Sequence, residues 1–194
     1  MECAAGVVIV AENPSRTLYK VSEIYDRIAF AGVGKYNEFQ SLKIGGIRLA
    51  DLKGYQYSPE DVTASSLANA YAQTLGQVFT HEMKPYEVEI LVAQVGAMPE
   101  EPNQLYHILY DGTVMDEQRF TVLGGEAERI ADVVGEGFTD SMPLADAVQL
   151  GARSLASEGE TLTATQLEVA LLDRERPKRA FRHIKGDELE ALLG

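Results

Sequence analysis

The stretch AFAGVGKYNEF, residues 29–39, has the residue types most suggestive of chemistry, because an apolar run ends there in Gly-Val-Gly-Lys. A phosphate-binding loop of the form Gly-x-x-x-x-Gly-Lys-Ser/Thr would need a glycine at position 29 and a hydroxyl side chain at position 36. The chain has Ala29 and Tyr36 at these positions. Because magnesium would find no hydroxyl ligand in such a loop, we expect neither a nucleotide nor any other cofactor.

Histidine spacing argues against a metal site. The chain has three histidines, His81, His107 and His183. His81 and Glu82 begin like the His-Glu-x-x-His helix of zinc proteases, but Pro85 stands where the second histidine would be. His107 and His183 fall in strand patterns with no Cys, Asp or Glu at ligand spacing. We therefore expect no metal ion, and we expect His81 to complement a helix dipole.

No side chain stands out as catalytic. A Gly-x-Ser-x-Gly nucleophile motif does not occur, and acid pairs such as Glu87 with Glu89 fit solvated faces. The net charge of -13 would repel nucleic acid and anionic membranes, so neither is expected as a partner. The single cysteine, Cys3, excludes an internal disulfide and suits a reducing cytoplasm. The first residues have no basic stretch before the apolar run, so a signal peptide is not expected.

Hydrophobic periodicity changes along the chain in blocks. Strands are expected at 7–10, 20–25, 28–33, 86–95, 105–110, 113 onwards, 120–123, 167–172 and 179–184. Helices are expected from 37, over 64–82, around 130–138 and 144–155, and at 186–193. Such blocks fit an α+β fold better than a doubly wound parallel sheet. We predict a single domain over residues 1–194, a four-layer αββα sandwich of two mostly antiparallel sheets between helix pairs.

Local signals refine this outline. Asn37 and Thr63 are predicted to cap the first two helices, and Asp111-Gly112 is predicted to form a hairpin turn. Gly45 and Gly46 lie inside the first helix at roughly 1 kcal/mol each relative to alanine, which suggests close backbone approach by a neighbour. The predicted core stripes are Phe39, Leu42, Gly46, Leu49 and Ala50 in the first helix, and Leu67, Ala70, Tyr71, Leu75, Val78 and Phe79 in the second.

Several long stretches resemble actinobacterial 20S proteasome α-subunits, which have the fold of N-terminal-nucleophile hydrolases. The resemblance spans nearly the whole chain, and the run YKVSEIYDR is specific rather than generic. It implies the αββα sandwich of that superfamily, in agreement with the layers expected above. The matching stretches are GVVIVAENPSRTLYKVSEIYDRIAFAGVGKYNEF, GGIRLADLKGYQY, LANAYAQTLGQVFT, KPYEVEILVAQV, LYHILYDGTV and LEVALLDRERPKRAFRHI.

The resemblance implies a subunit without catalytic residues. In the related β-subunits a free N-terminal threonine is the nucleophile, and an aspartate and a lysine support it. Lys20 matches that lysine, but Glu12 occupies the place of the aspartate and the threonine would fall before Met1. The alternative is a catalytic β-type or related ATP-dependent threonine peptidase subunit, which would need a processed threonine at its mature N-terminus.

For α-subunits, the resemblance implies a docking site for the C-terminal tails of a hexameric proteasomal ATPase. These tails enter pockets between neighbouring α-subunits and typically end in a hydrophobic residue, a tyrosine and any residue. Lys20 would pair with the terminal carboxylate, the turn at Gly34 would offer backbone contacts, and Lys35 is a weaker candidate beside them. An ordinary intramolecular salt bridge is the alternative role for Lys20.

The resemblance also implies protein partners. These are other α-subunits in a homo-heptameric ring, proteasome β-subunits, and unfolded protein substrates in transit, all in the cytoplasm. The helix with Gly45 and Gly46 is the candidate contact with a neighbouring subunit. Family members carry an N-terminal tail and helix before the strand that starts here at Gly6, and the sequence shows neither, so no gating residue is assigned.

Overall fold

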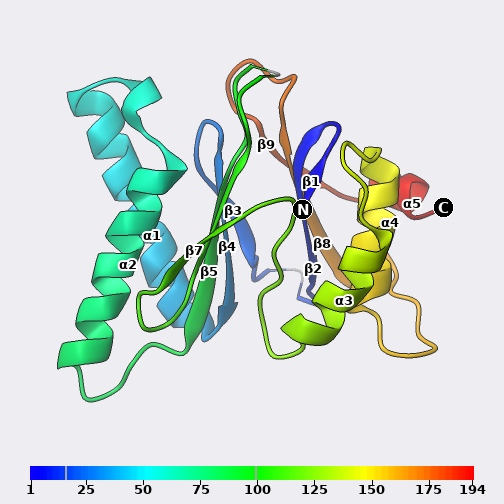
Figure 1. The fold of residues 1–194 in the computed structure, drawn as a ribbon, viewed down its shortest axis with the longest axis horizontal. Coiled ribbons are helices and arrows are strands. Elements are labelled where there is room, and N and C mark those ends of the chain that lie inside the picture. The colour runs from blue at the N-terminus through cyan, green and yellow to red at the C-terminus, as the bar shows by residue number, and fades with distance from the viewer. Residues whose placement is uncertain (16, 99) are drawn as a thin grey trace.

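The protein, represented here by a computed structural model that describes residues 1–15, 17–98 and 100–194, is built from four layers (Figure 1). Two β-sheets lie in the middle. Helices α1 (Tyr36–Gln56) and α2 (Ala64–His81) cover one sheet, and a short 3-10 helix (Pro59–Asp61) joins them. Helices α3 (Ala127–Gly137), α4 (Leu144–Leu155) and α5 (Asp187–Leu193) lie over the other sheet. The predicted αββα sandwich is therefore confirmed.

Every strand pair in both sheets is antiparallel. The five-stranded sheet follows chain order, whereas the four-stranded sheet has the order β1-β2-β8-β9 and so joins both ends of the chain. The strands of the first are β3 (Val21–Tyr25), β4 (Ile28–Gly34), β5 (Val88–Gln94), β6 (Gln104–Ile108) and β7 (Val114–Glu117). Those of the second are β1 (Glu2–Cys3), β2 (Gly6–Glu12), β8 (Leu167–Asp173) and β9 (Phe181–Ile184).

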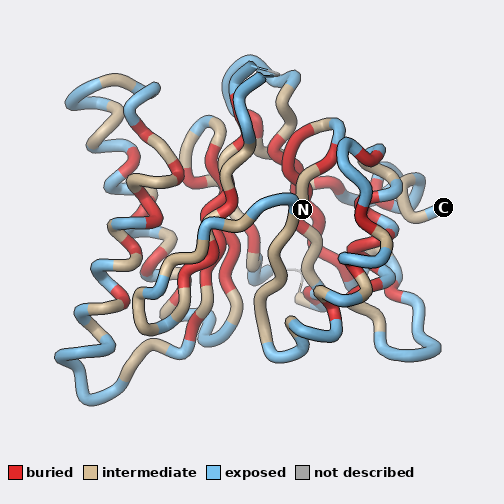
Figure 2. The backbone as a smooth tube through the Cα atoms, viewed as in Figure 1, coloured by how far each residue is buried: buried red, intermediate tan, exposed pale blue. Residues whose placement is uncertain are grey.

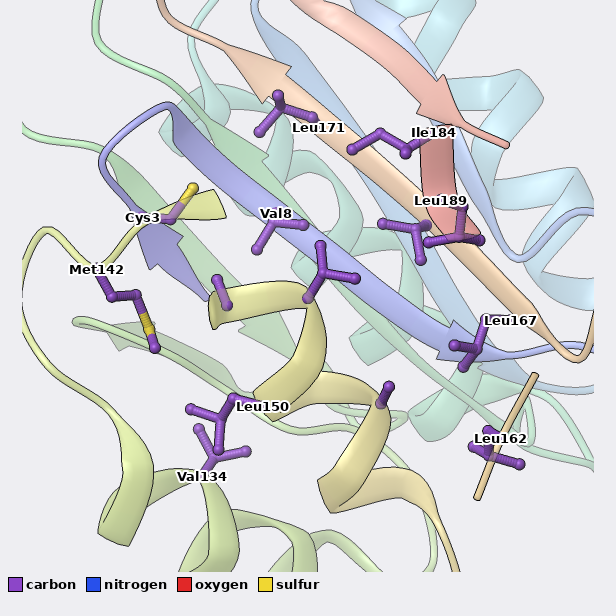
Figure 3. Close-up of a cluster of buried hydrophobic side chains, with 14 of the residues drawn as sticks. Cys3, Val8, Val134, Met142, Leu150, Leu162, Leu167, Leu171, Ile184 and Leu189 are labelled. Atoms are coloured by element: carbon purple, nitrogen blue, oxygen red, sulfur yellow. The ribbon is translucent and has the colours of Figure 1, made fainter. Parts of the chain in front are cut away.

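Three clusters of buried apolar side chains hold the layers together, one at each boundary between layers. Buried backbone therefore runs through the sheets and the inner faces of the helices, while the loops at both ends are exposed (Figure 2). In the cluster between the four-stranded sheet and its helices, Val8 and Leu171 of the sheet are joined by Leu150 of α4 and Val134 of α3, and Leu150 lies beside Val134 (Figure 3). Fully burying a side chain of this size stabilises the fold by roughly 1.5–3 kcal/mol.

Alternation along β8 assigns its side chains to two different boundaries. Leu167, Val169 and Leu171 belong to the cluster under the helices, whereas Ala170 and Leu172 belong to the cluster between the two sheets. Because successive side chains of a strand point to opposite faces, Glu168 faces the other sheet. A carboxylate thus occupies a position where the pattern of its neighbours would place an apolar residue.

The segment 120–123 is not the strand that the sequence predicted. It runs as an irregular connection between β7 and α3. Its apolar side chains instead pack against the core. Phe120 packs on Phe138 with ring centroids 5.6 Å apart, and Leu123 contacts the cluster between the sheets. The segment is as apolar as a buried strand because its side chains pack against the core, but it is not part of either sheet.

Two predictions about α1 and one about α2 were wrong. Asn37 does not cap α1, because the N-cap position is Lys35 and no side chain caps the helix there. Leu49 and Phe79 were placed in the core but are 39% and 45% exposed, and Phe79 packs on Tyr110 at the surface. Thr63 does cap α2, since its hydroxyl accepts a hydrogen bond of 3.2 Å from the amide of Ser66.

The two glycines inside α1 have different surroundings. A Cβ atom added at Gly46 would collide with the hydroxyl of Tyr71 on α2, so this glycine permits close approach of the two helices within the chain. A Cβ atom added at Gly45 would meet no atom within 4 Å. The close contact expected from the sequence is therefore intramolecular at Gly46, and an intersubunit contact remains a prediction for Gly45.

Candidate functional site

Lys20 lies immediately before β3, where the chain returns from the loop after β2. Its main chain is held on both sides, because its carbonyl accepts a hydrogen bond of 3.0 Å from the amide of Gly32 and its own amide donates one of 2.9 Å to Oε2 of Glu168. Its Nζ donates a hydrogen bond of 2.8 Å to the main-chain carbonyl of Glu12. In residues 1–15, 17–98 and 100–194, no carboxylate forms an ion pair with Lys20.

Lys20 and Glu12 line a cavity of about 440 Å³ that is bordered by strands of both sheets and by helices α3 and α4, which we call the Lys20 cavity. Among its lining residues, Val10 belongs to the four-stranded sheet and Gly32 to the five-stranded sheet. The connection 121–125 also borders it. The lining is largely apolar but also includes the acidic residues Glu12 and Glu126, neither of which forms an ion pair with Lys20. An ammonium group in this position can receive an anion.

Gly34 ends β4 with a φ of 103°. A Cβ atom at this position would collide with the main-chain carbonyl of Glu87, so a glycine is required for both conformation and space. Gly34 lines a second hollow of about 380 Å³, the Gly34 cavity, together with Glu89 and Tyr110. The two cavities have three lining residues in common, Val33, Gly124 and Gly125. Lys20 and Gly34 therefore line adjoining hollows.

Lys35 is placed differently from the other two predicted residues. Its Nζ lies 3.1 Å from Oε2 of Glu87, and Lys84 pairs with the same carboxylate at 3.4 Å. Hydrogen bonds from Lys35 and Lys84 lower the pKa of Glu87. Lys35 lines neither of the two cavities just described. Because these side chains are exposed, the ion pair adds little stability, but it does pair the positive charge of Lys35 with a negative one.

The sequence did not single out Glu168 or Asn13, which lie beside Lys20. Both are buried, and each is only 6% exposed. The side-chain Nδ2 of Asn13 donates a hydrogen bond of 2.6 Å to Oε2 of Glu168, while the main-chain amide of Val21 donates one of 2.9 Å to Oε1. The one available signal was a lone acidic residue in the otherwise apolar run LEVALL.

The histidines lie apart, as their spacing suggested. His81 is near the end of α2, with Nδ1 3.1 Å from the carbonyl of Gln77, and His107 lies 3.2 Å from Glu89. His183 packs between the rings of Tyr19 and Phe181. Across the described part of the chain, no three His, Cys, Asp or Glu side chains are grouped so as to hold a metal ion.

A larger hollow lies elsewhere. It measures about 840 Å³ and is bordered by α4, α5 and residues 160–165, and none of the three predicted site residues lines it. None of the helices in residues 1–15, 17–98 and 100–194 combines the length and hydropathy needed to cross a bilayer.

Comparison with known proteins gives concordant matches. A family model described as "Proteasome subunit" matches residues 1–172. A protein named "Proteasome subunit alpha" from Geodermatophilus obscurus is 53% identical over 200 residues, covering 98% of this chain and 69% of the relative. Relatives of the same name from Saccharopolyspora erythraea and Thermobifida fusca are 53% and 50% identical and cover 100% of this chain, with 76% and 78% of their own lengths matched.

Proposed function

Because this chain belongs to the proteasome subunit family, we propose that it is a non-catalytic α-subunit of a 20S proteasome core. Several copies would form the outer heptameric ring, stack on β-subunits and control the passage of unfolded proteins to the sites where the β-subunits cleave them. A single α-type domain in the cytoplasm would serve this role. The names of the relatives support an α-type subunit, and they are the reason to prefer it over a β-type one.

The observation that carries the docking part of the proposal is the chemical setting of Lys20. Nζ of Lys20 donates a hydrogen bond to the main-chain carbonyl of Glu12 and forms no ion pair with a carboxylate among the described residues. An ammonium group has three N–H donors, and the carbonyl takes one of them. The remaining donors are available to an incoming carboxylate.

Lys20, Gly34 and Lys35 are the proposed contacts for the C-terminal tails of a hexameric proteasomal ATPase. In this proposal Lys20 binds the terminal carboxylate, and the main chain at Gly34 pairs with the backbone of the tail. The adjoining cavities beside Lys20 and Gly34 support this arrangement. Lys35 would add a long-range positive charge, weakened by its pairing with Glu87.

The absence of catalysis can be tested by covalent labelling. The full natural chain is co-assembled with a proteasome β-subunit and treated with a fluorescent inhibitor that reacts with N-terminal threonines. We expect label on the β-subunit and none on this chain. Label on this chain, abolished when its first residue in the mature protein is changed to alanine, would show a catalytic subunit and overturn the proposal.

A further inference from the structure

We propose that Glu168 is a positioning residue for Lys20. Its buried carboxylate fixes the main chain from which the Lys20 side chain extends, and thereby directs the ammonium group into the Lys20 cavity. This inference rests on the proposed docking function, because it names the residue that would make Lys20 competent to bind a tail carboxylate.

The position of Glu168 is costly for a carboxylate. Glu168 is 6% exposed and faces the boundary between the two sheets, where Ala170 and Leu172 of the same strand contribute apolar side chains. A buried charge is tolerated when hydrogen bonds satisfy it. The carboxylate must therefore interact strongly with whatever lies opposite β8 at this point.

Three N–H groups satisfy that carboxylate. Oε2 accepts from the main-chain amide of Lys20 at 2.9 Å and from Asn13 Nδ2 at 2.6 Å, and Oε1 accepts from the main-chain amide of Val21 at 2.9 Å. Two consecutive main-chain amides thus bind the two oxygens of one carboxylate. Hydrogen bonds to an ionised acceptor are shorter and stronger than neutral ones, so this contact is well suited to fix a backbone.

The same carboxylate closes the base of the loop that leads to Lys20. The loop leaves β2 after Glu12, and Asn13 Nδ2 also donates to the carbonyl of Leu18 at 2.7 Å. At that base, Nζ of Lys20 reaches the carbonyl of Glu12. Glu168 therefore connects Asn13, which directly follows the residue that anchors the lysine tip, to Lys20 itself. A flexible four-carbon side chain needs such a fixed origin before its charge can be directed.

A neutral variant of nearly the same size tests whether the charge and the acceptor oxygens of Glu168 matter, rather than its volume. In Glu168→Gln, one carboxylate oxygen becomes an NH₂ group, which cannot accept from Lys20, Val21 or Asn13. The side-chain volume hardly changes, so the cavity and the sheet packing should be retained. Glu2→Gln is a matched control, because the Glu2 carboxylate accepts from one main-chain amide, that of Arg119 at 3.0 Å, and from Nδ2 of Asn103 at 2.8 Å.

The test is a double-mutant cycle on the complex assembled with β-subunits. The probe is a fluorescent peptide with the C-terminal sequence of the ATPase and a free carboxylate. We expect Glu168→Gln to weaken the Kd by roughly tenfold, the scale of one charge-assisted hydrogen bond, and Glu2→Gln to leave it unchanged. In a Lys20→Ala background, Glu168→Gln should change the Kd by less than about twofold, because the residue acts through Lys20.

The outcomes separate the inference from the function on which it rests. If Lys20→Ala leaves the Kd unchanged, the docking proposal fails and takes this inference with it. If Lys20→Ala weakens binding but Glu168→Gln does not, or if the two losses simply add, only the positioning role of Glu168 is overturned. A C-terminally amidated peptide should bind the wild type and Glu168→Gln equally, and a difference between them would also contradict the inference.

A second measurement requires no variant and covers the case in which Glu168→Gln fails to fold. Amide hydrogen exchange of the assembled complex should show slow exchange at Lys20 and Val21 and fast exchange at Thr17, whose amide bonds only to an exposed serine hydroxyl in the loop. Equally fast exchange at all three amides would show that the carboxylate does not hold this backbone in solution, and would overturn the inference.

Discussion

The ammonium group of Lys20 lies 2.8 Å from the main-chain carbonyl oxygen of Glu12, across the gap between the end of β2 and the start of β3. A carbonyl neutralises no charge, so the lysine remains a positive group in the wall of a cavity whose lining is largely apolar but includes Glu12 and Glu126. The salt bridge considered from the sequence as an alternative is absent among residues 1–15, 17–98 and 100–194. This arrangement leads directly to the first prediction.

Lys20→Ala should weaken binding of a tail peptide to the assembled complex by at least about tenfold, because a hydrogen bond to a charged group is typically worth roughly 1.5–3 kcal/mol. Fluorescence anisotropy of the labelled peptide measures this Kd directly. Lys35→Ala serves as the comparison and should have a smaller effect, since Glu87 already pairs with its charge. An unchanged Kd for Lys20→Ala would remove this residue from the site.

Gly34→Ala should destabilise the chain more than Gly124→Ala does. Both glycines have positive φ, 103° and 114°, so both variants strain the backbone by roughly 1–3 kcal/mol. Only at position 34 would the new Cβ atom also collide with the carbonyl of Glu87, whereas nothing lies within 4 Å of a Cβ atom at 124. Urea unfolding of both variants measures the difference, and equal losses would show that the contact with Glu87 is not tight.

The two glycines of α1 should respond oppositely to alanine. Gly45→Ala should stabilise the unassembled chain by about 0.5–1 kcal/mol through helix propensity, whereas Gly46→Ala should destabilise it because of the collision with Tyr71. If Gly45 packs against a neighbouring subunit, Gly45→Ala should nevertheless reduce the yield of assembled complex. Thermal unfolding and size-exclusion chromatography give the two readouts. Undiminished assembly would rule out Gly45 as a close intersubunit contact.

The stability of the chain should fall in mildly acidic solution because of His183. Burial, followed by the nearby charge of Lys185, lowers the pKa of His183 from its ordinary value of 6.5, and Glu168 opposes this only in part. A histidine with a lowered folded-state pKa binds fewer protons than in the unfolded chain, so its contribution is complete above pH 6.5 and is lost as the pH falls toward the folded-state pKa.

Thermal unfolding of the wild type and of His183→Gln, compared between about pH 7.5 and pH 5.5, isolates this contribution. The wild type should lose more stability than the variant over that interval, because glutamine has no proton to gain. Parallel curves for the two proteins would mean that His183 does not experience the buried surroundings described above.

Local chemistry explains which parts of the fold could be predicted from the sequence. The Thr63 cap and the hairpin turn at 111–112 depend on neighbouring residues alone, and both are present. The connection 120–123 was misread because an apolar run that covers a core has the same composition as a strand. Hydrophobic periodicity alone could not show which helical positions lie at the exposed edge of a layer. Leu49 was therefore predicted in the core, whereas it is exposed.

The candidate site was only partly predictable for a different reason. Lys20 and Gly34 followed from a resemblance, and the structure places them beside adjoining cavities. Glu168 is 148 residues from Lys20 in the chain, and no local pattern relates the two. Their contact arises only when β8 pairs with β2 and brings its inward-facing carboxylate against the start of β3.

The central claim is that this chain forms the non-catalytic wall and docking surface of a proteasome core. Native mass spectrometry of the full natural chain, co-expressed with a proteasome β-subunit, tests it most directly. The account predicts a heptameric ring of this chain bound to a ring of β-subunits, with peptidase activity that disappears when the β-subunit loses its N-terminal threonine. A monomer that remains separate from assembled β-subunits, or peptidase activity from this chain alone, would contradict it.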